Sequence, residues 1–366
     1  MVIFLLSFFI LVTFINILFY IGYFSFATSK ESNSTSTPPV SVIICAKNEA
    51  ENLKNFIPAI LQQNYSEFEL ILVNDASQDD TLEVMEYFKD LDTRVQLVDV
   101  KNNEAFWGKK KYALTLGIKK AKNSTLLFTD ADCKPETDMW ISEMASKFVD
   151  KKSIVLGYGG YEKNKGSLLN KLIRYETLLT AIQYFSFAKW GIPYMGVGRN
   201  LAYTSQEFYN QNGFATHLHI RSGDDDLFVN QAGTEENTSI NFSRASIIRS
   251  IPESTFANWI LQKRRHVSTA KLYKKKHKFL LASFYLTQIG FWVFFLMLLV
   301  LKIHWPIVLA VLVLRLIIQY TVYFNSAKKL NEMDLLFLIP FLEVFLIFTQ
   351  LGIFSMNIFS KPSTWK

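Results

Sequence analysis

The apolar residues of this chain are concentrated at its two ends. Residues 1–27 contain no charged side chain, and three further apolar stretches lie roughly at residues 279–301, 305–324 and 335–359. Each is close to the ~20 apolar residues that a helix needs to cross a bilayer. The first stretch lacks the basic start and the short apolar core of a cleaved signal peptide. The pattern therefore predicts four membrane-spanning helices, one before and three after a polar middle.

The polar middle alternates two hydrophobic periods. A Ser/Thr-rich linker ends at Pro39, and short β-branched or apolar runs then alternate with stretches of helical spacing. The expected strands are residues 40–45, 69–73, 95–98 and 124–129, and the expected helices are residues 49–63, 81–89 and 109–121. Such alternation predicts right-handed βαβ units and a mainly parallel, buried sheet.

Two amphipathic helices are expected beyond this alternation, at residues 167–187 and 252–276. The whole pattern predicts an α/β protein with flanking transmembrane helices. We expect the chain to divide into a transmembrane helix at 1–28, a linker at 29–39, a catalytic α/β domain at 40–250, a basic amphipathic interfacial helix at 251–278 and three transmembrane helices at 279–360.

The net charge of +7 has a location. Basic residues gather just before the second span and between the third and fourth: Lys271, Lys274, Lys275, Lys276, His277, Lys278, Lys328 and Lys329. Lys and Arg beside spans favour the cytoplasmic side, so we expect a multi-pass membrane protein with its polar middle in the cytoplasm. Because the charges lie beside the spans, nucleic acid is not an expected partner. Arg315 interrupts the third span and is expected to face the helix bundle or a polar cavity, since facing lipid costs about 2.5–3.5 kcal/mol.

Acidic residues follow two of the expected strands. Asp130 and Asp132 come directly after residues 124–129, and Asp75 follows the strand at 69–73. In a parallel sheet, ligands bind beyond the carboxyl ends of the strands. Two carboxylates one residue apart suit a hard divalent cation that retains phosphate oxygens, although acidic pairs at turns are common. A carboxylate at Asp75 suits a base or ribose, but Ser77 or Asp79 nearby also makes a good helix cap.

The segment Cys45-Ala46-Lys47-Asn48-Glu49 ends the first strand and starts a helix. By itself it is more typical of a helix cap than of a site. Together with Asn74-Asp75-Ala76-Ser77, Gly108-Lys109-x-x-x-Ala113-Leu114 and Phe128-Thr129-Asp130-Ala131-Asp132-x-x-Pro135, it resembles the family 2 inverting glycosyltransferases over roughly residues 40–266.

This resemblance implies the Rossmann-like nucleotide-sugar fold called GT-A and a set of residue roles. Ala46 and Glu49 would line the nucleotide pocket, and Asp75 would bind the base. Lys109 would hold the nucleotide or its phosphates, with an ordinary solvated lysine as the alternative. Asp130 would meet the ribose or the metal, Asp132 would coordinate the metal, and the cofactor would be Mg²⁺ or Mn²⁺.

The resemblance continues along the chain. Gly196 to Tyr203 is similar to the family's acceptor-side loop, where Gly198 and Asn200 would meet the acceptor; a plain turn is the alternative. In Ser222-Gly223-Asp224-Asp225-Asp226-Leu227 the catalytic base would be Asp224, with Asp225 as the alternative because Gly223 replaces the usual Glu.

A basic motif follows at residues 262–266. Gln262 and Arg265 match the Gln-x-x-Arg-Trp motif of processive synthases, in which the Arg pairs with the diphosphate. His266 stands at the position of the Trp, on the acceptor side, which argues against polymer synthesis. A basic interfacial helix face is the alternative interpretation.

The expected function is transfer of a hexosyl or N-acetylhexosaminyl group, with inversion, from a UDP- or GDP-sugar to a membrane lipid or growing glycan. A processive polysaccharide synthase, similar to those making poly-N-acetylglucosamine or hyaluronan, is the second hypothesis. A membrane scaffold without turnover is the third, and the retained acidic residues Asp75, Asp130 and Asp132 argue against it.

Overall fold

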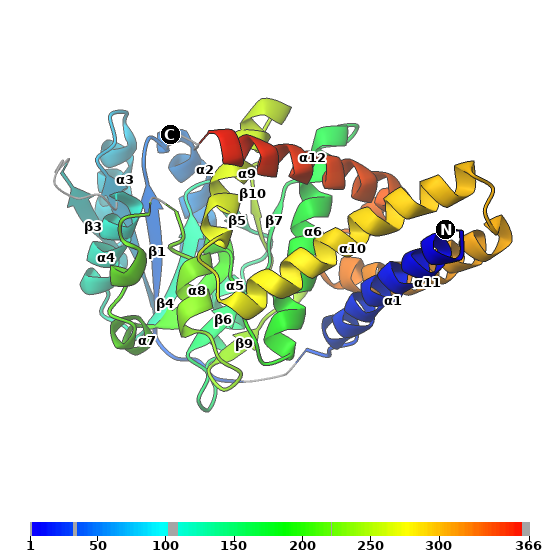
Figure 1. Cartoon of the computed structure of the whole chain (residues 1–366). Helices are drawn as coiled ribbons and strands as arrows, with labels where there is room; N and C mark the ends of the chain where they lie inside the picture. The colour runs from blue at the N-terminus through cyan, green and yellow to red at the C-terminus, as the bar shows by residue number, and fades with distance from the viewer. Residues whose placement is uncertain (1, 32–34, 102–108, 221, 361–366) are drawn as a thin grey trace. The chain divides into compact units, whose positions relative to one another are not determined.

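The computed structural model describes residues 2–31, 35–101, 109–220 and 222–360 (Figure 1). The chain forms two compact units. Of the described residues, the helical unit comprises 2–30, 167–186 and 255–360, and the α/β unit comprises 31, 35–101, 109–166, 187–220 and 222–254.

The α/β unit is built on a seven-stranded sheet of order β3-β2-β1-β4-β8-β6-β9. Its strands are β1 (Val40–Ala46), β2 (Phe68–Asp75), β3 (Val95–Val100), β4 (Thr125–Asp130), β6 (Ile154–Leu156), β8 (Leu201–Thr204) and β9 (Thr238–Ile240). Strands β1 to β4 run parallel, β8 is antiparallel to β4 and β6, and β9 is parallel to β6. The prediction of a mainly parallel sheet is confirmed.

A second sheet of order β5-β10-β7 lies in the same unit. It consists of β5 (Cys133–Pro135), β7 (Gly159–Tyr161) and β10 (Ile248–Ser250). Strand β5 follows Asp132 directly and pairs Cys133 with Ser250. A segment more than a hundred residues further along the chain is thereby brought beside the acidic pair.

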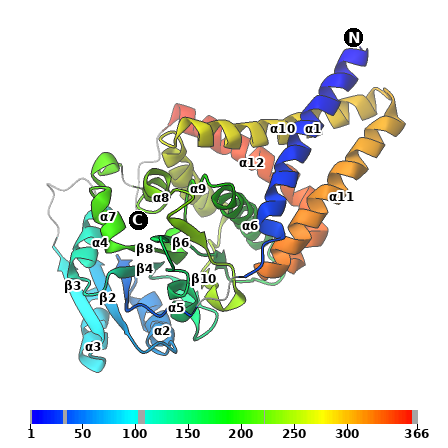
Figure 2. The ribbon, with the colours of Figure 1, turned by 90° about the horizontal axis from the view of Figure 1, so that it is seen from below.

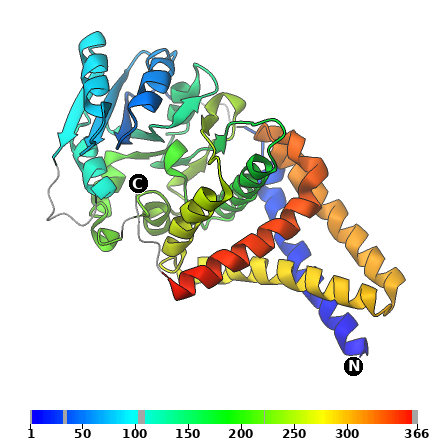
Figure 3. The same ribbon diagram turned by 90° about the horizontal axis from the view of Figure 1, so that it is seen from above.

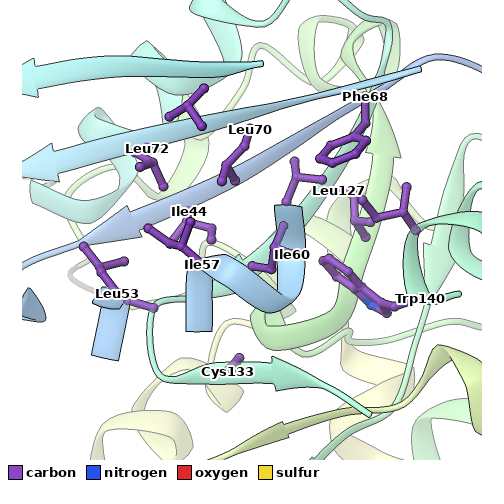
Figure 4. Packing of buried hydrophobic residues seen from close by; sticks show 14 of the residues in the cluster. Ile44, Leu53, Ile57, Ile60, Phe68, Leu70, Leu72, Leu127, Cys133 and Trp140 are labelled. Atoms are coloured by element: carbon purple, nitrogen blue, oxygen red, sulfur yellow. The ribbon is translucent and has the colours of Figure 1, made fainter. Parts of the chain in front are cut away.

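Helices cover both faces of the main sheet. On one face, α2 (Ala50–Leu61), α3 (Thr81–Leu91) and α5 (Trp140–Ala145) bury apolar side chains in one core cluster with alternate residues of β1 and β2. Figure 4 shows Leu53, Ile57 and Ile60 of α2 in this cluster. On the other face lies α4 (Lys109–Lys120), whose Gly117 is so close that an added Cβ would come within 2.8 Å of Val73. Glycine is required for this approach, and it fixes α4 against β1 and β2.

Shorter elements complete the α/β unit and carry parts of the candidate site. They are η1 (Gly198–Asn200), α7 (Ser205–Asn210), η2 (Ala215–His217), α8 (Asp226–Ala232) and η3 (Arg244–Ser246). Helix α6 (Leu168–Lys189) begins in the helical unit and ends in the α/β unit.

The helical unit contains the four long apolar helices that the sequence predicts. They are α1 (Val2–Ala27), α10 (Lys275–Val300), α11 (Trp305–Lys329) and α12 (Ile339–Phe359), the last preceded by η4 (Met333–Leu338). Helix α1 packs against both α10 and α11 (Figure 2), and α12 packs against α9 (Phe256–Ala270) and α10 (Figure 3). Pro340 lies in the first turn of α12, where its missing N–H leaves no bond unmade.

The expected basic helix at 252–276 differs from what the structure shows. Helix α9 ends at Ala270, where Leu272 and Tyr273 make short-range bonds to the carbonyls of Thr269 and Ala270, and Lys275 already begins α10. No glycine or proline marks this break, so the periodicity of the sequence runs through it.

The expectation for Arg315 is confirmed. Its side chain is fully buried among α1, α11 and α12 and is paired with Glu343. Arg174 of α6 is held in the same unit by Glu332 and Asp334.

Candidate active site

The carboxyl ends of three parallel strands form one edge of the main sheet. In their registers Cys45 of β1 is opposite both Val73 of β2 and Asp130 of β4, and Ala46 is opposite Asn74. The segments after these strands therefore lie side by side although they are about 30 and 85 residues apart in sequence. This edge collects the acidic residues predicted from the sequence.

The turns after β1 and β2 are tied to each other. Asn48, at φ 56°, donates its N–H to Ser77 Oγ at 3.1 Å, and its Oδ1 accepts from the N–H of Gln78 at 2.8 Å. The N–H of Glu49 is bonded to Thr81 Oγ1 at 2.8 Å. The polar residues that suggested helix caps therefore link two strand ends, and this linkage fixes the wall that contains Ala46 and Asp75.

Glu49 and Asp75 present carboxyls on this wall. Asp75 is 6% exposed at the end of β2. Burial raises the pKa of the Glu49 carboxyl even though Asn52 donates a hydrogen bond to it at 2.6 Å; Asp132 and Asp130 raise it further. The electrostatic influence of Asp132 and Asp130 shows that Glu49 lies near the acidic pair.

The acidic pair is held from both sides. Asp132 Oδ2 accepts a 2.6 Å bond from the Oγ of Ser250 in β10, and its Oδ1 accepts a weak bond from the Cys133 thiol at 3.5 Å. The ligand atoms of Asp130, Asp132 and Cys133 lie within 4.8 Å of one another. The two carboxylates suit a hard cation such as Mg²⁺ or Mn²⁺. Cys133 is also part of the hydrophobic core, and burial raises the pKa of its thiol, so the carboxylates form the better ligand set.

Lys110 joins the acidic pair to the expected base. Its Nζ lies 3.0 Å from Asp130 Oδ1 and 3.2 Å from Asp224 Oδ2. Although burial opposes it, the Lys110 ammonium lowers the pKa of Asp130. One cation therefore bridges a strand-end carboxylate and a carboxylate 94 residues later.

Lys110 was not among the residues predicted from the sequence, where Lys109 was chosen. The side chain of Lys109, together with Gly108, lies outside the part of the chain that the structure describes. A helical signal for Lys110 was present: it precedes Ala113, Leu114 and Gly117 by three, four and seven positions, which is the spacing of a buried helix face. Ala113 and Leu114 are indeed buried.

The segment Gly223-Asp224-Asp225 has a backbone that explains its glycine. Gly223 has φ 94°, and a Cβ there would lie 2.5 Å from Leu227. A Glu at this position, as in the family motif, would be strained. The glycine therefore allows the turn that directs Asp224 to Lys110.

Asp224 and Asp225 have different surroundings. Asp225 Oδ2 accepts the N–H of Gly198 at 2.7 Å, and its Oδ1 accepts the N–H of Asp226 at 2.7 Å. Burial, and then the charges of Asp224 and Asp226, raise the pKa of Asp225 to about 7. Both oxygens of Asp225 are thus used to hold the loop, whereas Asp224 has its carboxylate beside the acidic pair.

The loop before β8 contributes a glycine and a buried amide. Gly198 is close enough that a Cβ would lie 3.2 Å from Asp225 Oδ2. The Asn200 side chain is fully buried: it accepts from Trp140 Nε1 at 3.0 Å and donates to the carbonyls of Tyr158 and Ser246. Its amide is therefore occupied in holding the loop.

Arg199, between these two residues, was missed in the sequence. Its guanidinium lies 4.2 Å from the centroid of the Tyr161 ring, and its charge acts on both Asp130 and Asp132. A cation next to the acidic pair reduces the cost of gathering the carboxylates.

A cavity opens among these groups. It is lined by Lys110, Asp130, Asp224 and Asp225 together with Cys45, Leu114, Phe128, Thr129, Gly198, Leu201 and Tyr203. Asp224 and Asp130 thus face the same space. An arrangement of this kind can hold a cation and a proton acceptor at one site.

Gln262, Arg265 and His266 lie on α9 in the helical unit. Gln262 and Arg265 are half-buried, and His266 is exposed. Their neighbour Arg264 donates to Asn357 Oδ1 at 2.9 Å and to Ser360 at 2.7 Å, which joins α9 to the end of α12. The α/β unit alone brings together Ala46, Glu49, Asp75, Asp130, Asp132, Gly198, Asp224 and Asp225.

Residues 41–215 match the family model described as Glycosyl transferase family 2. This stretch contains the tied strand ends, the acidic pair and the loop of Gly198. Residues 41–215 are a family 2 glycosyltransferase domain. The family expectation drawn from the motifs is thereby confirmed.

Known proteins with sequence similarity to the glycosyltransferase domain match this chain over only part of their own length. An uncharacterized glycosyltransferase of Haemophilus influenzae is 28% identical over 158 residues, which is 43% of this chain and 44% of that protein. A poly-beta-1,6-N-acetyl-D-glucosamine synthase of Staphylococcus epidermidis is 27% identical over 146 residues, 39% of this chain and 34% of that protein. The chain spans less than two thirds of the length of the curated relatives it matches.

The fold of the glycosyltransferase domain is also seen in solved structures. A mannosyltransferase of Pyrobaculum calidifontis, in complex with GDP-Man and Mn²⁺, has a TM-score of 0.57 and 15% identity, over 93% of this chain and 99% of that chain. At this identity the likeness shows the fold, and it confirms the expected GT-A architecture.

Proposed function

We propose that this protein transfers one sugar, with inversion, from a UDP- or GDP-linked donor to a lipid or glycan acceptor at the membrane. The observation that carries the proposal is the Lys110 bridge, which places Asp224 beside Asp130 in one cavity. Inverting transfer needs a proton acceptor near the donor site, and this juxtaposition supplies one.

The donor would lie along the carboxyl edge of the sheet. We assign the nucleotide to the wall formed by Ala46, Glu49 and Asp75, with Asp75 accepting from the base. The buried position of Asp75 suits a carboxylate whose partners come from a ligand that excludes water. Lys109, Gln262 and Arg265 are assigned to the diphosphate, where Arg265 offers two parallel N–H donors.

The acidic pair is assigned to a divalent cation. A metal held by Asp130 and Asp132 would supply Lewis-acid neutralisation of the leaving diphosphate. The solved mannosyltransferase complex contains Mn²⁺, which supports metal dependence without choosing between Mn²⁺ and Mg²⁺. Ser250 holds Asp132 and Lys110 holds Asp130, so each carboxylate keeps its orientation.

Asp224 is assigned as the base. The acceptor oxygen forms a bond to C1 of the sugar as the bond from C1 to the donor phosphate oxygen breaks, and the hydroxyl proton goes to the Asp224 carboxylate. Attack opposite the leaving group inverts C1. Asp225 is the alternative base, and its raised pKa favours a proton acceptor near neutral pH. Its two main-chain bonds argue instead for a role in holding the loop of Gly198.

The acceptor would reach the site from the membrane. Gly198 brings main chain close to Asp225 and lets the acceptor approach, whereas the buried Asn200 is assigned to support of this loop. His266 is exposed on α9 and is assigned to the acceptor side. The basic residues beside α10 and α11 support a cytoplasmic position for the α/β unit, because Lys and Arg beside spans favour that side.

Processive polymer synthesis is the second candidate. It is favoured by the similarity to the poly-beta-1,6-N-acetyl-D-glucosamine synthase and by Gln262 and Arg265 of α9. Sizing of radiolabelled product separates the two functions, because single transfer gives one lipid-extractable species and polymerisation gives a ladder.

A panel of nucleotide sugars on membranes containing the full chain tests the proposal. Release of nucleotide diphosphate is expected with a UDP- or GDP-sugar and is expected to stop in EDTA. Asp224→Asn and Asp132→Ala should each reduce the rate at least a hundredfold, while Asp90→Asn, an exposed change on α3, should leave it unaltered. Turnover that persists in EDTA would refute the proposed metal dependence. Full activity of Asp224→Asn would assign the role of base to Asp225 instead.

A further inference from the structure

Lys111 is a fully buried lysine whose bonds all go to main-chain carbonyls of one segment. Its Nζ donates to the carbonyl of His217 at 2.7 Å, of Ile220 at 3.0 Å and of Ser222 at 2.8 Å. An ammonium has three N–H donors, so these carbonyls use its full capacity.

The segment held by Lys111 leads directly to the proposed base. The carbonyl of Ser222 belongs to the peptide bond that precedes Gly223, and Asp224 follows the positive-φ turn at Gly223. Glycine does not restrict its own backbone. The peptide before it therefore needs an external anchor if Asp224 is to keep one position, and Lys111 provides that anchor.

Neighbouring lysines of α4 divide the task. Consecutive helix residues are about 100° apart around the axis, so Lys110 and Lys111 leave the helix in different directions. Lys110 pairs with the side chain of Asp224, and Lys111 holds the main chain before it. Gly117 fixes α4 closely on β1 and β2. Both lysines therefore hold Asp224 at a set position relative to the sheet edge where the donor would bind.

We propose that Lys111 is a positioning residue of the transfer reaction, which sets the place of the Asp224 carboxylate by holding the main-chain carbonyls of His217, Ile220 and Ser222. This inference rests on the proposed role of Asp224 as base. Lys111 touches neither donor nor acceptor in this assignment, and it acts through the segment that it anchors.

The burial of Lys111 supports a role of this kind. Burial lowers the pKa of its ammonium to about 8, and the charges of Asp224, Asp226 and Asp225 oppose that effect. Burying a charge has a cost that its bonds must offset. An apolar side chain of similar length would fill the same space without that cost, but it would leave three carbonyls unbonded.

Lys111→Met tests the inference in the full-length protein in membranes. Methionine keeps most of the length of the side chain and removes all three donors. We expect kcat to fall between about tenfold and a hundredfold, as for a small misplacement of a reacting group, with binding of UDP or GDP within twofold of wild type. Lys119→Met, the same change at an exposed site of α4, should alter neither quantity.

Two results would overturn the inference. A kcat within twofold of wild type would show that the anchor is not needed, and parallel loss of kcat and nucleotide binding would show a role in stability alone. If Lys111→Met does not accumulate, Lys111→Gln replaces it. This variant retains two N–H donors, and its kcat is expected to fall by more than any loss of nucleotide binding can explain.

A double variant separates this inference from the proposed function. In the Asp224→Asn background, Lys111→Met should cause no further loss of turnover, because the carboxylate that it positions is gone. If the double variant instead loses turnover by the product of the two single losses, the inference is refuted while Asp224 remains the proposed base. Full activity of Asp224→Asn alone would instead refute the proposed base, and the inference with it.

Discussion

The buried charge pair of the helical unit makes a quantitative prediction. Arg315 of α11 donates to Glu343 of α12 and, at 2.9 Å, to Asn16 Oδ1 of α1. Gln288 of α10 donates to Glu343 Oε1 at 3.0 Å, and Gln319 donates to Glu343 Oε2 at 2.9 Å. One network of charged and amide groups thus joins all four apolar helices.

Removing one partner of the Arg315–Glu343 pair should lower the free energy of unfolding far more than removing both. Arg315→Met leaves the carboxylate of Glu343, which is 1% exposed, without its cation. Breaking a buried pair in this way destabilises by about 3–5 kcal/mol, whereas apolar replacement of both partners is often neutral or stabilising. We therefore expect Arg315→Met and Glu343→Met each to lower the free energy of unfolding by about 3–5 kcal/mol. The double variant should lower it by less than either single variant.

The difference is measured as a double-variant cycle on the full chain in detergent micelles. Unfolding is followed by tryptophan fluorescence during titration with a denaturing detergent, and the coupling energy is the non-additive part of the three changes. Leu314→Met, a substitution at an exposed position of α11, controls for the introduced methionine.

If each single variant loses less than about 1 kcal/mol, or if the losses simply add, then the charges of Arg315 and Glu343 do not stabilise one another in the folded protein.

Two further outcomes are expected in the α/β unit. Burial, and then the charge of Lys111, lower the pKa of His217 to about 4 from an ordinary 6.5, so the unfolded chain takes up this proton first as the pH falls. Stability attributable to the neutral ring is present above pH 6.5 and is lost towards pH 4, by up to about 3 kcal/mol. Because His217→Asn lacks this proton uptake, its free energy of unfolding should fall less between pH 7 and pH 4.5 than that of wild type. An equal fall in both proteins would contradict this. Gly198→Ala places a Cβ 3.2 Å from Asp225 Oδ2 and should slow transfer about tenfold with nucleotide binding retained. Gly352→Ala, where the added Cβ meets no atom within 4 Å, is its control, and equal rates for both variants would exclude a role for the close approach.

Several features were readable from the sequence because they depend on local order. Four uncharged or nearly uncharged stretches of sufficient length predict four apolar helices wherever they pack. The alternation of short strands with helices predicts a parallel sheet, and the position of Asp75, Asp130 and Asp132 directly after strands places them at one edge. These predictions need the period of the side chains and the direction of the strands, and nothing about distant residues.

The tertiary structure decided which distant groups meet. Lys110 joins Asp130 to Asp224. Its spacing from Ala113, Leu114 and Gly117 indicates a buried position, but the sequence does not say which carboxylates it meets. Asn200 belonged to a motif typical of acceptor loops, yet its amide is enclosed by Trp140 and two carbonyls. The partner of Arg315 was likewise undetermined until α12 placed Glu343 beside it.

The physical reason is the same in each case. A side chain's direction on its own helix or strand follows from the local period, but its partner depends on how elements tens or hundreds of residues apart are packed. The sequence by itself therefore determined the elements and the chemistry at their ends. Packing alone decided which charges are paired, which amides are buried, and where Asp224 lies relative to the acidic pair.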